Sequence, residues 1–97
     1  RSRMIDIISE STERQLVHHY CLLTQNNRYD LSIAFSSHFY GKSMVTSIQS
    51  SKMASLCLED IHSEHYWAPK LGIAEEDISE IQNFFSMVLP SKHICEL

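Results

Sequence analysis

Residues 31–48 read LSIAFSSHFYGKSMVTSI, and this stretch decides between two folds. Leu31, Ile33 and Phe35 alternate with small or polar residues, which is typical of a half-buried strand. A turn around Gly41 would lead into a second strand, and this alternative predicts an α+β domain with a hairpin near 31–48. The same residues also fit two short helices on either side of Gly41. Periodicity alone therefore leaves both folds open.

Composition favours the helical alternative. The sequence holds ten Ile and nine Leu but only three Val and three Thr. Ser, Gln, Glu, Met and Ala fill many of the spacer positions, which indicates a helical bias. We therefore expect an all-α fold, a compact bundle of four to five short helices, in a single domain that spans residues 1–97.

The expected helices follow from capping residues and apolar spacing. Thr12 and Gln15 have the form of a capping box and precede apolar residues at helical spacing, which predicts a helix over 12–24. Further helices are expected over about 30–41 and 43–57. A last helix begins with the acids at 75–77 and ends at Pro90. Pro69 indicates that the residues before it form a helix end or a loop.

The charge distribution and the lack of a long apolar run argue against two classes of partner. Residues 1–58 carry six basic and four acidic residues, a net charge of +2, whereas residues 59–97 carry two basic and eight acidic residues, a net charge of −6. A basic stripe of the kind that binds nucleic acid is missing, so we expect no nucleic-acid partner. No apolar run approaches the roughly 18 residues of a membrane span, so we expect no membrane partner.

The three cysteines bear on the compartment. Cys21, Cys57 and Cys95 are too few and too widely spaced for a secreted disulfide scaffold, which favours a reducing, intracellular compartment, either cytoplasm or nucleus. The sequence begins with Arg1 rather than Met, and it carries no signal-peptide pattern. We therefore expect a domain of a longer protein.

Aromatic residues supply the candidate contact surface. Trp67 is the only tryptophan and lies beside Tyr66 in an interrupted segment, where it would fill the core or anchor a partner. Two other aromatic pairs are adjacent in sequence, and neighbours on a helix cannot both face one core. The acidic start of the last helix would attract a basic partner. The candidate partner-binding residues are Phe39, Tyr40, Tyr66, Trp67, Phe84, Phe85, Glu75 and Glu76.

The function expected from these patterns is non-enzymatic. No nucleophile, base and oxyanion donor can be named together, so we expect neither catalysis nor a cofactor. We predict a protein–protein interaction or assembly domain, a scaffold or adaptor, that binds a partner protein or associates with itself through an aromatic and apolar surface. The alternative is a small zinc-binding or thiol-dependent domain, although the spacing matches no known zinc motif. Its candidate ligands are Cys57, His62, His65, His93 and Cys95.

Overall fold

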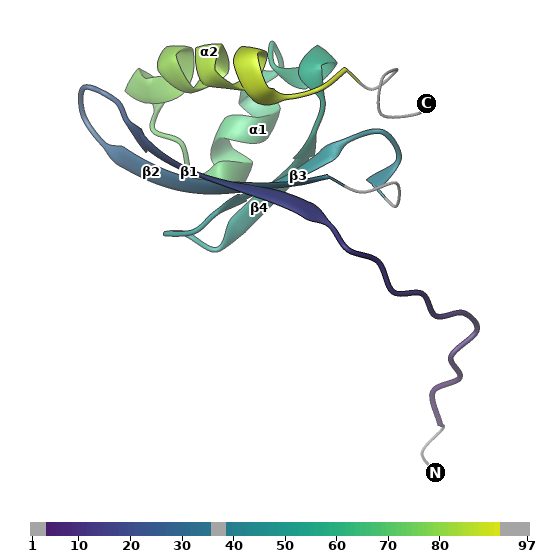
Figure 1. The fold of residues 1–97 in the computed structure, drawn as a ribbon. Coiled ribbons are helices and arrows are strands. Elements are labelled where there is room, and N and C mark those ends of the chain that lie inside the picture. The colour runs from purple at the N-terminus through teal and green to yellow at the C-terminus, as the bar shows by residue number, and fades with distance from the viewer. Residues whose placement is uncertain (1–3, 36–38, 92–97) are drawn as a thin grey trace.

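The domain consists of a four-stranded sheet and two helices (Figure 1). The computed structural model describes residues 4–35 and 39–91. Two short 3-10 helices, η2 (Leu58–Asp60) and η3 (Glu75–Asp77), precede the two α-helices. The main elements, in chain order, are β1 (Leu16–Leu23), β2 (Arg28–Phe35), β3 (Ser43–Ser47), β4 (Lys52–Leu56), α1 (Glu64–Leu71) and α2 (Ile78–Val88).

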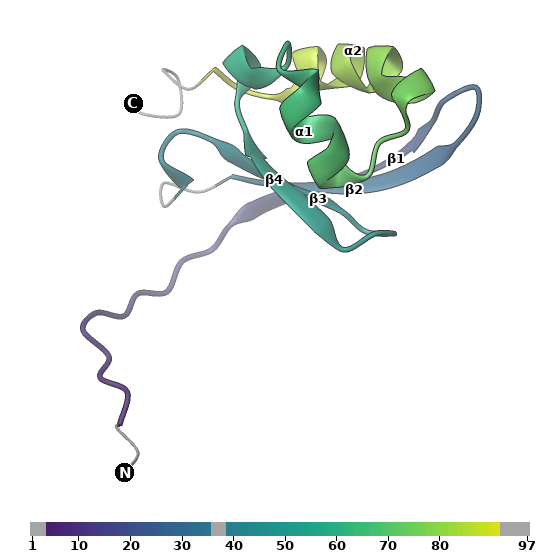
Figure 2. The ribbon, with the colours of Figure 1, turned by 180° about the vertical axis from the view of Figure 1, so that it is seen from behind.

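The sheet is a simple antiparallel meander. Its strand order is β1-β2-β3-β4, so every strand pairs with its neighbours in sequence. Leu31 of β2 lies opposite Tyr20 of β1 and Ser47 of β3, and Val45 of β3 lies opposite Ala54 of β4. Both helices cover the same face of the sheet, and Figure 2 shows the two layers from behind. The fold is therefore α+β with one helix-covered sheet face.

The expected all-α bundle is wrong. The segments 12–24, 30–41 and 43–57, which were expected to be helical, hold the four strands and their connections. The alternative with a hairpin near 31–48 describes this part of the fold correctly, because β2 and β3 pair across the turn at Gly41. The term helical bundle does not apply to this domain, and the scaffold and adaptor roles that went with it have no support in the fold.

The core lies between the sheet and the helices. Alternate residues of β2 point toward the helices, and among them Tyr29, Leu31 and Ile33 are buried. Trp67 of α1 and Phe85 of α2 are both fully buried, and their rings meet edge to face with centroids 5.1 Å apart. The largest fully buried apolar side chains are Trp67, Phe85, Leu31, Ile33, Leu56, Leu71, Ile81 and Val45.

Helix α1 continues through Pro69, so the expected helix end or loop over 65–68 is also wrong. Trp67, Ala68 and Leu71 are buried, and the burial of these side chains outweighs the loss of one helical hydrogen bond at proline. The helix ends at Gly72, which adopts the left-handed conformation with φ of 69°. The N–H of Ile73 then donates to the carbonyl of Ala68, which closes the helix end.

The last helix was placed correctly near its C-terminus. Helix α2 ends at Val88, just before Pro90, and it buries Ile81 and Phe85 on its inner face. Its acidic start is a separate 3-10 turn, η3, rather than the first turn of α2. Within the described ranges, no helix has the length and apolar character needed to cross a membrane.

Gln49, in the β3–β4 turn, completes the pairing of β2. Its Oε1 accepts a hydrogen bond of 3.0 Å from the N–H of Asp30, and its Nε2 donates to the Asp30 carboxylate at 2.8 Å. The N–H of Ile48 donates to the carbonyl of Asp30 at 2.8 Å. Strand β3 pairs with β2 only from Leu31 onward, so these contacts satisfy the backbone of Asp30 beyond the end of the ladder.

Candidate functional site

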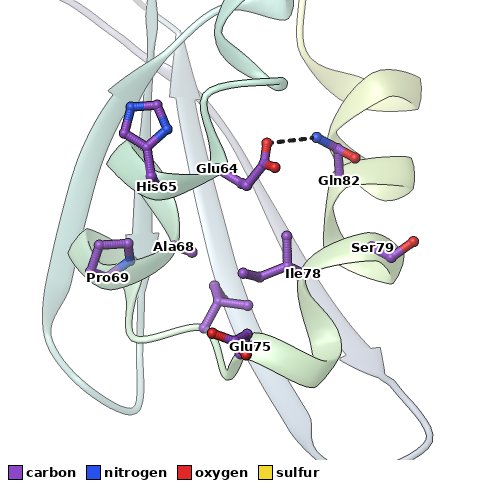
Figure 3. Close-up of a pocket in the computed structure, with 9 residues that line it drawn as sticks. Glu64, His65, Ala68, Pro69, Glu75, Ile78, Ser79 and Gln82 are labelled. Atoms are coloured by element: carbon purple, nitrogen blue, oxygen red, sulfur yellow. Dashed lines mark hydrogen bonds between the residues drawn. The ribbon is translucent and has the colours of Figure 1, made fainter.

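The candidate site is a groove between α1 and α2 with a volume of about 710 Å³ (Figure 3). This volume lies within the range of about 300–1,000 Å³ that is usual for ligand sites in proteins. Its lining comes from α1, α2 and the connection between them, with no residue from the sheet. It is lined by Glu64, His65, Ala68, Pro69, Ile73, Glu75, Ile78, Ser79 and Gln82.

The groove combines apolar and polar side chains. Ala68 and Ile73 are buried, and Ile78 is half-buried beside them. At one end of the groove Glu64 and Gln82 face each other from the two helices, and Gln82 Nε2 donates to Glu64 Oε2 at 3.4 Å. Glu75 lies at the other end (Figure 3). The arrangement therefore offers an apolar surface with hydrogen-bonding groups at its edges.

The short connection from α1 to α2 shapes one end of the groove. Gly72 ends α1 in the left-handed conformation, and the next residue, Ile73, lines the groove. A Cβ at Gly72 would lie 3.4 Å from Ser50 Oγ, in a backbone conformation that side chains rarely adopt. The position of Ile73 and Glu75 thus depends on glycine at this turn.

Asp77 holds this connection to the sheet. Its carboxylate is fully buried, and Oδ2 accepts hydrogen bonds of 2.6 Å from Tyr29 Oη and from Asn27 Nδ2. The same Tyr29 Oη accepts a hydrogen bond of 3.0 Å from the N–H of Ala74. The hydrogen bond from Tyr29 lowers the pKa of Asp77, with Asn27 contributing, in spite of burial. We call Asn27, Tyr29, Ala74 and Asp77 the Asp77 cluster.

The other end of the groove is fixed at the carbonyl of Ile61. This oxygen accepts a hydrogen bond of 2.7 Å from Gln82 Nε2 and another of 3.0 Å from Trp67 Nε1. Gln82 therefore ties α2 to the segment that precedes α1, at the position where it also contacts Glu64. Because hydrogen bonds hold both ends, the positions of α1 and α2 on either side of the groove are fixed by the fold.

The lining of the groove is rich in acidic residues. Glu64 and Glu75 are its two carboxylates, and none of its lining residues is Lys or Arg. Glu76 of η3 and Glu80 in the first turn of α2 are exposed acids in the same region of the chain. His65 is the one basic residue of this lining, and two carboxylates favour a ligand that carries a cationic group.

The sequence profile of the SAV0927-like family matches residues 8–87. The chain belongs to the SAV0927-like family. The matched range runs from before β1 to the last turn of α2, so in this SAV0927-like chain it includes the sheet and every lining residue of the groove. No curated protein matches the chain. The family match carries no activity.

Of the eight predicted partner-binding residues, Glu75 lines the groove. Glu76 is exposed next to it. Tyr66 is partly exposed on α1 and carries Lys70 Nζ above its ring, 5.4 Å from the centroid. Trp67 and Phe85 are fully buried, so their side chains belong to the core of the SAV0927-like fold and offer no surface to a partner.

The remaining three aromatic residues do not line the groove. Tyr40 is 85% exposed in the β2–β3 connection and has a positive φ of 55°, and Phe39 is half-buried beside it. Phe84 packs against Tyr20 of β1 with ring centroids 4.9 Å apart. The predicted aromatic residues are thus divided between the core, the sheet edge and a turn, and they do not form one contact surface.

The zinc alternative gains nothing from the described residues, which contain no group of three or more His, Cys, Asp or Glu side chains able to hold a metal ion. Cys57 is buried, and its Sγ donates to Asp60 Oδ2 at 3.3 Å. Burial raises the pKa of this thiol to about 11, with the Asp60 hydrogen bond contributing. His62 is exposed and His65 lines the groove. His93 and Cys95 lie outside the described residues.

Sequence reasoning missed most of the groove. Glu64 and Ala68, like Ile78 and Gln82, are separated by four residues and therefore share a helix face. That spacing was a usable signal, but the interpretation of Pro69 as a helix end removed α1 from consideration. The residues missed are Glu64, Ala68, Pro69, Ile73, Ile78, Ser79 and Gln82.

Proposed function

We propose that the protein is a non-enzymatic binding protein whose α1–α2 groove takes a short segment of a partner protein. The segment would place an apolar side chain against Ala68, Ile73 and Ile78 and a Lys or Arg near Glu64 or Glu75. The observation that carries this proposal is an apolar groove whose lining contains two carboxylates, Glu64 and Glu75, and no Lys or Arg. An apolar contact supplies affinity, and the charges favour one kind of partner over another.

The shape of the site supports a peptide segment as the ligand. The groove lies open between two helices on the protein surface, and a segment exposed on a partner reaches such a site without a large rearrangement. The hydrogen bonds at Ile61 and at the Asp77 cluster hold the two helices in place. A preformed groove reduces the ordering that binding requires.

The test uses two short peptides that differ only in charge. Both are capped heptapeptides with two Leu residues in a Gly and Ser background, one with two Lys and the other with two Glu. Each is titrated into ¹⁵N-labelled protein while amide shifts are recorded. We expect the Lys peptide to shift the amides of Ile73, Ser79 and Gln82, and the Glu peptide to shift them much less. Equal effects of both peptides, or shifts confined to other regions, would contradict the proposal.

Variants separate the groove from general acidity. Glu64→Gln and Glu75→Gln should each weaken binding of the Lys peptide by about two- to fivefold, the usual range for an exposed charge pair. Glu80→Gln is the matched control, because Glu80 is an exposed acid of α2 that does not line the groove.

A further inference from the structure

The N-terminal arm, residues 4–15, leaves the folded domain along the line of β1 (Figures 1 and 2). It has no regular secondary structure. Four apolar side chains near its start, Met4, Ile5, Ile7 and Ile8, are between 75% and 96% exposed. An exposed group of large apolar side chains on one segment is typical of a surface that binds another molecule.

Strand β1 offers a matching surface. It lies at one edge of the sheet, and within the described residues its outer side has no strand paired to it. Its sequence, LVHHYCLL, contains no Lys, Arg, Asp, Glu or Pro. Charged residues and proline are the usual protection of an edge strand against pairing with another chain. The other edge strand, β4, begins with Lys52. The edge of β1 is therefore open to strand addition.

We propose that two copies of the chain associate by exchanging these arms, so that the arm of each copy pairs with β1 of the other as a fifth strand. The arm and β1 are continuous in sequence, so an antiparallel exchange around a two-fold axis uses the same contacts twice. The arm has a reach of roughly 40 Å when extended, which exceeds the length of β1. Isoleucine, which is frequent in the arm, is favourable in strands.

Charge selects the register of this pairing. If the two-fold axis lies between residues 13 and 14, Glu13 lies opposite Arg14 of the second copy, and Arg14 lies opposite Glu13. The same register places Ile5 opposite Leu22 and Ile7 opposite Tyr20. A shift by one residue in either direction places Glu13 opposite Glu13 or Arg14 opposite Arg14, and like charges directly opposite each other destabilise a strand pair.

In this register the side chains of Ile5 and Ile7 point to the apolar face of the sheet. Tyr20 and Leu22 lie opposite Leu31 and Tyr29 in the β1–β2 ladder, so their side chains point to the helix-covered face. Both are partly buried and pack at the margin of the core. Ile5 and Ile7 of a second copy would extend this apolar face by one strand.

The first measurement is the mass of the chain in solution, by sedimentation equilibrium at roughly 100 µM, where a dissociation constant in the micromolar range gives mostly dimer. We expect a dimer. Ile5→Ser combined with Ile7→Ser should shift the equilibrium to monomer, whereas Met87→Ser, a change at an exposed apolar residue of α2, should not. A monomeric chain, or a dimer that persists in the Ile5 and Ile7 variant, would overturn the proposal.

The second measurement tests the register through charge exchange. Glu13→Arg and Arg14→Glu each replace two attractive pairs by two repulsive ones, so each variant alone should dimerise roughly tenfold more weakly or worse. A mixture of the two variants restores both attractive pairs and should form a heterodimer with the original affinity. Both residues are exposed in the arm before β1, and thermal melts of each variant check that the domain remains folded. Failure of the mixture to recover affinity would reject the exchanged pairing.

Discussion

Tyr29 and Asp77, which are 48 residues apart in sequence, are joined by a hydrogen bond of 2.6 Å from Tyr29 Oη to Asp77 Oδ2. The bond connects β2 to the connection between the two helices. Since Tyr29 Oη also accepts from the N–H of Ala74, one phenol orders two positions of that connection. The groove between α1 and α2 therefore depends on a side chain of the sheet.

Acid should weaken the domain through Asp77. Its pKa is lower in the folded state than in the unfolded chain, so its contribution to stability is present above a pH of about 4 and is lost as pH falls through the folded value. Asp77→Asn should therefore lower the melting temperature near neutral pH and reduce its further fall below pH 4. Thermal melts between pH 7 and pH 2 measure this. An unchanged acid profile in Asp77→Asn would contradict it.

Removal of the Tyr29 hydroxyl should destabilise the connection between the helices. Tyr29→Phe leaves the ring in the core but deprives the Asp77 carboxylate of a donor and the N–H of Ala74 of an acceptor. We expect a loss of about 1–3 kcal/mol in the free energy of unfolding, measured by urea denaturation. Tyr66→Phe is the matched control, because Tyr66 is partly exposed and lies outside the Asp77 cluster. Equal effects of the two changes would argue against the assigned role.

Phe85 should be among the most costly side chains to truncate. It is fully buried and contacts Trp67 edge to face, so Phe85→Ala should lower the free energy of unfolding by about 3–5 kcal/mol. Met87→Ala, two residues further along α2, should change it by less than about 0.5 kcal/mol because Met87 is 78% exposed. Urea denaturation of both variants gives the comparison. Similar losses of unfolding free energy in the two variants would contradict the assignment of Phe85 to the core.

The turn at Gly72 should not tolerate a side chain. Gly72→Ala forces a Cβ into the left-handed conformation, and we expect a loss of roughly 1–2 kcal/mol in the free energy of unfolding. Ser51→Gly is the converse change, since Ser51 already has a φ of 58°. Glycine relieves the backbone strain at this position but also raises the entropy of the unfolded chain, and the two effects oppose each other. We therefore expect the free energy of unfolding to change by less than about 0.5 kcal/mol. A neutral Gly72→Ala would show that this turn rearranges.

Cys57 should be far less reactive than Cys21. With a pKa of about 11, only about 0.1% of the Cys57 thiol is ionised at pH 8, and the side chain is buried. Cys21 is exposed on β1. In a Cys95→Ser background, iodoacetamide followed by peptide mass spectrometry should modify Cys21 at least about a hundredfold faster than Cys57. Unfolding in urea should remove the protection, and comparable rates in the native protein would contradict it.

The failure of the helical prediction has physical causes in particular strands. In β1, Leu16 and Tyr20 are four residues apart, and an even spacing satisfies the two-residue period of a strand as well as one turn of helix. In β3 the inward residues are Ser43, Val45 and Ser47, so the strand shows no apolar alternation. The composition argument was also weak, because the ten Ile residues are β-branched and favour strands.

Other parts were accessible from sequence. The hairpin around Gly41 was visible as an alternative, and the period of α2 and its end before Pro90 were clear. Glu75 was proposed for a basic partner and lies in the groove. The rest of the groove depends on Tyr29 and Asp77, whose contact spans 48 residues, and neither local spacing nor composition reports a contact of that range.

Gln49 has a consequence for where the sheet can grow. Its side-chain amide occupies the position of one more peptide group beside Asp30, and it satisfies backbone groups that a longer β3 would otherwise have bonded. If β3 continued here, its backbone would expose further donors and acceptors on the side away from β2. The Gln49 side chain exposes no such row. Gln49 therefore blocks strand addition beside residues 28–30 of β2, which extend beyond the pairing with β3. The sheet can add a strand along β1 but not at this position.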